Sequence, residues 1–147
     1  MKHRWAALAL VLALSAFMAG SVQGQEASSG ALGRERGSVK LGQNYPNPFN
    51  PETTIPFSVG DPPTCTEGSR LYRVSLRIYN VLAQLVAIPI VQGRGEPLDN
   101  LKLPCGSYKG YWDGKVRNTG REAASGIYIY ELVVDGERSA KKMFVAK

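Results

Sequence analysis

The stretch LGQNYPNPFNPETTIPFSV, residues 41–59, decides the fold. Prolines at positions 46, 48 and 51 punctuate its first half. Each proline fixes its own φ and pushes the preceding residue toward extended geometry. In residues 53–59, apolar and polar side chains alternate, which is the period of a half-buried strand. A rigid polar lead-in that feeds an apolar strand often starts a β-sandwich, so we expect an all-β domain that begins at Leu41.

The rest of the chain continues in short alternating segments separated by turn residues. Further strands are expected at residues 72–80, 84–90, 108–112, 127–134 and 140–146. The dipeptide Asp135-Gly136 favours a hairpin turn between the last two. Residues 60–69 are expected as a loop, and residues 92–106 as a long connection. With the strand at 53–59, this pattern predicts an Ig-like or fibronectin III-like β-sandwich of about seven strands.

The expected strand at residues 127–134 carries two tyrosines on one face. Tyr128, Tyr130, Leu132 and Val134 share a face, while the opposite face carries Glu131. We therefore expect the tyrosine face to point inward, with each hydroxyl reaching backbone or water. The alternative is an exposed tyrosine pair that stacks on sugar.

Composition excludes several classes of function. The chain has 147 residues, which suits one domain, and a formal net charge of +6 with scattered basic residues. We expect a soluble basic surface and no nucleic-acid partner, because no nucleic-acid-binding motif is present. The single histidine, His3, lies in a segment that we expect to be removed. Without it, and without paired carboxylates, the sequence predicts no enzyme, no cofactor and no metal site.

The beginning of the chain reads as an export signal. Lys2 and Arg4 precede an apolar run at 5–18 and then small residues, so residues 1–24 are expected to be a signal peptide, with cleavage after Gly20 as an alternative. Residues 25–40 are polar and are expected to form a flexible linker, followed by the sandwich domain at 41–147. The sequence thus predicts export by the general secretory pathway and no transmembrane span in the mature chain.

Five blocks of sequence carry a resemblance to a known family. The first block is QNYPNPFNP with the T-x-I-x-F that follows it, beginning at residue 43. The other four are IYNVLAQLV from residue 78, WDGKVRNTG from 112, ASGIYIYEL from 124 and KKMFVAK from 141. In this order they resemble the C-terminal sorting domain (type A) of type IX secretion, which is related to the Ig-like domain of flagellar hook-capping proteins. The resemblance covers residues 41–147. The matching positions are Asn44, Tyr45, Pro46, Asn47, Pro48, Phe49, Asn50, Pro51, Trp112, Asp113, Gly114, Ser125, Gly126 and Tyr128.

The resemblance implies how the protein is handled. It implies that outer-membrane secretion machinery recognises the domain and its last strand, and that the protein reaches the cell surface or the medium. The expected sorting signature is Lys141, Lys142, Met143, Val145 and Lys147. Attachment to cell-surface polysaccharide or protein is also implied. The family's large cargo domain has no counterpart in residues 25–40.

Two features leave other interpretations open. Lysines on an edge strand also discourage edge-to-edge aggregation, without any sorting role. Alternatively, the domain is a structural or adhesive module that binds a protein or glycan through an edge strand or loops.

The family usually has glycine where Ala83 stands, so we expect a different turn there or about 1 kcal/mol of strain.

Cys65 and Cys105 are an even pair in an exported domain, so we expect them to form a disulfide. The chain-entropy model gives about 4 kcal/mol for closing such a loop. A redox-active or metal-binding pair is the alternative, although the spacing is not C-x-x-C. For Trp112-Asp113-Gly114 we expect a core tryptophan followed by a turn rather than a binding motif. A weak ion site at residues 113–120 stays open.

Overall fold

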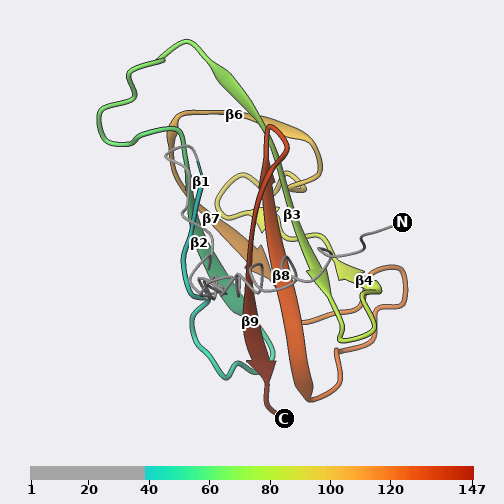
Figure 1. Cartoon of the computed structure of the whole chain (residues 1–147). Helices are drawn as coiled ribbons and strands as arrows, with labels where there is room; N and C mark the ends of the chain where they lie inside the picture. Colours follow the sequence, from blue (N-terminus) through green and yellow to red (C-terminus); the bar gives the residue numbers. More distant parts are fainter. Residues whose placement is uncertain (1–38) are drawn as a thin grey trace, which may run out of the picture. The chain divides into compact units, whose positions relative to one another are not determined.

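The computed structural model describes residues 39–147 (Figure 1). This part of the chain contains no helix and forms two antiparallel sheets of four and five strands, which confirms the expected β-sandwich. The strands are β1 (Val39–Leu41), β2 (Thr53–Val59), β3 (Leu71–Tyr79), β4 (Leu85–Ala87), β5 (Ile90–Val91), β6 (Leu101–Pro104), β7 (Gly106–Trp112), β8 (Gly126–Val134) and β9 (Glu137–Val145). The expected signal peptide at 1–24 and most of the expected linker at 25–40 lie outside the described residues.

The first sheet has the strand order β1-β2-β7-β5, and the second has the order β4-β3-β8-β9. In the second sheet β3 is central. It pairs with β8 on one side, while β6 pairs with its beginning and β4 with its end on the other side. The strand β9 lies along the edge of this sheet, beside β8 (Figure 1).

The core follows from the alternation of side chains along the long strands. Every second residue of β2 is buried, from Thr53 to Val59, and the remaining residues are half-buried. In β8 the inward residues include Tyr130, which is fully buried, and Tyr128, which is 8% exposed. This placement confirms the inward tyrosine face. It also overturns the idea that these two tyrosines stack on sugar, because stacking requires exposed rings.

Two short strands, β1 and β6, lie where the sequence analysis expected none, and the described residues form nine strands instead of about seven. The strand β1 starts at Val39, inside the expected linker, and pairs with the end of β2. Three residues are too few to show a period, which is why the sequence pattern missed it. The expected connection at 92–106 contains β6 and the start of β7, because β6 gains its partner from β3 far away in the sequence.

The expected strand at 84–90 is two strands in different sheets. The first, β4, pairs with β3 in the second sheet, and β5 pairs with β7 in the first. Pro89 lies between them and is buried, and its ring removes the N–H that a continuous ladder would need. The chain crosses from one sheet to the other at this proline.

Two turns behave as their residues suggested. Asp135 and Gly136 both have positive φ, 48° and 86°, and they join β8 to β9 as a two-residue hairpin. Ala83 has φ 59°, the left-handed conformation that favours glycine, so the strain expected at this position is present. The Asn80 side chain stabilises this turn, because its Oδ1 accepts bonds from the N–H groups of Leu82 and Gln84 at 3.0 Å each.

Candidate functional site: the junction of the lead-in and the last strand

The proline-rich lead-in is bonded directly to the end of β9. The Phe49 N–H donates to the Phe144 carbonyl at 3.0 Å, and the Ala146 N–H donates to the Phe49 carbonyl at 3.0 Å. The Phe144 N–H donates to Asn47 Oδ1 at 3.0 Å. The lead-in and the C-terminus therefore meet at one end of the sandwich (Figure 1). We call this contact the junction; it comprises residues 47–49 and 144–146.

The junction closes only part of the outer edge of β9. Val134 and Glu137 flank a two-residue hairpin, so the backbone groups of every second residue of β9, beginning with Glu137, bond to β8. The backbone N–H and carbonyl groups of the residues between them point away from β8, toward the outer edge. The outward residues are Arg138, Ala140, Lys142 and Phe144. The Lys142 carbonyl accepts a hydrogen bond from Gln43 Nε2 at 3.1 Å. Residues 43–49 therefore cover the outer edge of β9 from Lys142 onward.

The structure divides the expected sorting residues into two groups. Met143 is fully buried and Val145 is 6% exposed, so these two anchor β9 in the core. Lys142 and Lys147 are exposed, and Lys141 is half-buried. Lys147 is fixed by its N–H bond to Ser125 Oγ at 3.1 Å and by its ion pair with Glu122 at 3.0 Å.

Three aromatic residues from separate motif blocks meet in the core near the junction. The rings of Phe49 and Trp112 lie 5.4 Å apart, and those of Trp112 and Tyr128 lie 5.8 Å apart, both edge to face. Trp112 is buried and its Nε1 donates to the Lys115 carbonyl at 2.9 Å. This is the core role expected for Trp112, and such edge-to-face pairs add stability beyond area burial.

The remaining motif residues line the same end of the sandwich. Asp113 Oδ1 accepts from the Lys115 N–H at 3.0 Å and so shapes the turn after β7. Gly114 lies against the backbone of Pro51. The other members are on the surface: Tyr45, Pro46, Pro48, Asn50 and Gly126. Among the described residues, no three His, Cys, Asp or Glu side chains lie close enough to hold a metal ion, at residues 113–120 or elsewhere.

Asn44 and Tyr130 fasten the start of the lead-in to β8, and the sequence analysis missed this pairing. The Tyr130 hydroxyl donates to the Gly42 carbonyl at 2.8 Å and accepts from the Asn44 N–H at 3.0 Å. The Asn44 side chain, itself buried, donates to Thr53 Oγ1 at 3.0 Å. Burial raises the pKa of Tyr130 to about 12, against a smaller lowering by the bond from Asn44.

The substitution Tyr130→Phe tests this fastening. Leaving the Asn44 N–H and the Gly42 carbonyl without their buried partner lowers the free energy of unfolding by about 1–3 kcal/mol at neutral pH. The pKa of Tyr130 is higher in the folded state, so its contribution is complete below pH about 10 and disappears as the pH rises toward about 12. The phenylalanine variant therefore loses less stability over that pH range than the parent protein.

Denaturant unfolding at a series of pH values measures both effects. The matched control is Tyr45→Phe, because Tyr45 is 46% exposed and its removal changes stability by less than about 0.5 kcal/mol. Equal losses in the two variants would show that the Tyr130 hydroxyl has no structural role.

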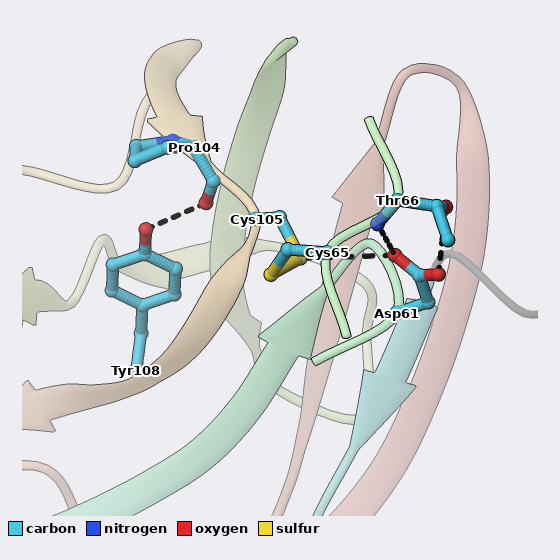
Figure 2. The surroundings of a disulfide bond; sticks show 6 residues. All are labelled: Asp61, Cys65, Thr66, Pro104, Cys105 and Tyr108. Carbon is cyan, nitrogen blue, oxygen red and sulfur yellow. Dashed lines mark hydrogen bonds between the residues drawn. A yellow bond between two sulfur atoms is a disulfide. The ribbon is translucent and has the colours of Figure 1, made fainter. Parts of the chain in front are cut away.

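The expected disulfide is present and lies beyond the end of β2 (Figure 2), where Cys105 lies against Gly60. Cys65 and Cys105 are bonded, with their Cα atoms 5.6 Å apart, and the described residues contain no free cysteine. Next to the bond, Asp61 accepts from the N–H and hydroxyl of Thr66 at 3.1 and 2.8 Å. The hydroxyl bond from Thr66 is the main reason that the pKa of Asp61 is lowered. The Cys65–Cys105 disulfide ties the loop at residues 60–70 to the corner between β6 and β7.

No family model matches the chain, and no curated protein matches it. Among solved structures, the chain is similar to Pseudomonas fluorescens alkylpurine DNA glycosylase AlkC bound to DNA containing an abasic site analog. The two are 11% identical with a TM-score of 0.48, over 76% of this chain. The chain spans 31% of the length of that structure.

This similarity corrects one expectation from the sequence. The matched protein is an enzyme, which contradicts the prediction that this chain is not one, and we withdraw that prediction. A likeness at this level assigns no reaction, substrate or DNA contact to this chain. No helix among residues 39–147 is long and apolar enough to cross a membrane.

Proposed function

We propose that the chain is an exported β-sandwich whose last strand is recognised by the type IX secretion machinery of the outer membrane. The junction carries this proposal. The lead-in motif and the terminal strand, which both carry the family resemblance, are bonded to each other through Asn47 and Phe49. A receptor that contacts this end of the sandwich would meet both motifs at once.

The positions of the lysines support recognition of the folded domain. Met143 and Val145 hold β9 in the core, while Lys142 and Lys147 stay exposed. A partner can therefore contact the cationic side chains without unfolding the sheet. After recognition, the resemblance implies delivery to the cell surface or the medium, with attachment to surface polysaccharide or protein.

A charge-reversal experiment tests the proposal. The full chain is expressed in a bacterium that has the type IX translocon, and in a matched strain that lacks it, and its location is measured by cell fractionation. We expect release in the first strain and retention in the periplasm in the second. The variant Lys142→Glu moves most of the protein into the periplasm of the first strain; Lys147 is left unchanged because it pairs with Glu122.

The control for charge alone is Lys109→Glu, an exposed lysine that lies outside the terminal strand and outside the blocks that carry the resemblance. It should be released like the parent protein. Point substitutions are preferable to deletion of residues 140–147, because deletion removes the buried Met143 and Val145 and the junction bonds. Release that is unaffected by loss of the translocon would refute type IX sorting.

The second candidate function is a structural or adhesive module that binds a protein or glycan partner. It is favoured by the tip of the turn between β3 and β4, where Val81 and Leu82 are 68% and 75% exposed. The bonds of Asn80 hold this tip in one conformation, which reduces the entropy cost of binding. Release without the translocon would favour this candidate over sorting.

A further inference from the structure

A groove on the outer face of the second sheet places two cations directly opposite each other. Arg73 of β3 and Lys102 of β6 are cross-strand partners, so their side chains leave the sheet on the same face. Like charges in this position are destabilising. Both residues are exposed and line a groove of about 460 Å³.

No carboxylate compensates this pair within the part of the chain that the structure describes. Neither the Arg73 guanidinium nor the Lys102 ammonium takes part in an ion pair there. Asp135 also lines the groove, but its Oδ1 accepts from the Arg73 backbone N–H at 2.9 Å and its Oδ2 from Arg70 at 3.1 Å. Arg70 is shared between Asp135, at 3.1 Å, and Glu67, at 2.7 Å. The three basic residues Arg70, Arg73 and Lys102 therefore exceed these two carboxylates by one, and the groove keeps a positive charge beside Arg73 and Lys102.

Neutral polar groups lie in the next row of the same face. Ser75 follows Arg73 at a spacing of two residues, and its Oγ accepts from the Asn100 N–H at 2.9 Å. Ser75 is 4% exposed although it lies on the outward face, so it forms the floor of the groove. Leu71, which is 57% exposed, supplies an apolar wall beside the cations.

We propose that this groove binds a carboxylate-bearing saccharide, with the carboxylate between Arg73 and Lys102 and the sugar hydroxyls toward Ser75 and Asn100. The planar fork of arginine suits a carboxylate, and lysine adds a second charge-assisted bond. An extended peptide that adds to a strand is disfavoured, because β3 already pairs with β6 and β8 along this groove. This site does not depend on the proposed sorting function.

The test is isothermal titration calorimetry of the purified full chain with a tetramer of galacturonic acid. We expect binding that weakens as salt is added, because charged groups carry it. The variant Lys102→Glu should weaken binding at least about 10-fold, since it removes a charge-assisted bond and repels the ligand. This variant keeps the fold, because it replaces a like-charge pair with an opposite-charge pair, and its melting temperature is unchanged or higher.

Three comparisons make the result decisive. Lys109→Glu, the same charge change on the other sheet, leaves binding unchanged if the groove is the site. Equal weakening by both variants would overturn the proposal, because it would show attraction to net charge alone. A neutral tetramer of glucose should not bind. Absence of binding by the galacturonic acid tetramer, or equal binding by a tetraglutamate peptide, would also overturn the assignment to an acidic saccharide.

Discussion

Replacement of both cysteines, Cys65→Ser with Cys105→Ser, lowers the free energy of unfolding by about 4 kcal/mol. The bond spans a sequence separation of 40 residues, and the unfolded chain without it gains the entropy of an open loop. The native contacts near the bond change little, since Asp61 and Thr66 keep their own hydrogen bonds. The destabilisation therefore acts mainly through the unfolded state.

Denaturant unfolding with and without a thiol reductant checks this result. The parent protein in reductant should unfold at the midpoint of the double variant, and the double variant should not respond to reductant. The slope of the free energy against denaturant should increase when the bond is removed, because the unfolded chain expands. A loss below about 1 kcal/mol would contradict the loop-entropy account, which predicts several times more.

Gly114→Ala is the second substitution with a large expected effect. Gly114 has φ 77°, and a Cβ there would overlap the Pro51 carbonyl oxygen and lie 2.9 Å from the carbonyl carbon. The left-handed conformation costs an alanine about 1–2 kcal/mol, and forcing atoms into a packed site adds about 1–3 kcal/mol. We expect a total loss of about 3 kcal/mol or more, with displacement of the lead-in from the turn after β7.

Gly120→Ala separates the two causes. Gly120 lies in the same connection with φ 67°, but nothing lies within 4 Å of the position that its Cβ would take. Its replacement should cost only the conformational term, about 1–2 kcal/mol. Thermal or denaturant unfolding of the two variants gives the comparison. Equal losses would show that the close approach of Gly114 to Pro51 is unimportant for stability.

The long strands could be predicted because their sequences carry a period of two. Ile55 and Phe57 in β2, and Val74 and Leu76 in β3, alternate with more polar residues, and burial follows that alternation except at Ser75, which is also buried. The hairpin turn at Asp135-Gly136 could be predicted for a different reason, since both residues tolerate positive φ. These are local properties, and a single sequence displays them.

The short strands and the sites depend on distant partners, which the sequence does not display. β6 is four residues long and exists because β3 pairs with it, so the opposition of Arg73 and Lys102 was invisible. The junction is made mostly of backbone groups, and its Asn47 bond joins positions 97 residues apart. The resemblance identified the motif residues in the sequence. Only the structure shows which of them contact each other.

The junction also determines when this chain can finish folding. Phe49 obtains its backbone partners from Phe144 and Ala146, which are synthesised long after it. Such non-local closure is slow, because the entropy of a long loop is lost before the contact forms. Until the final strand emerges, the second sheet lacks its edge and the first motif lacks its anchor. The nascent polypeptide therefore lacks part of its native contacts until β9 has been translated.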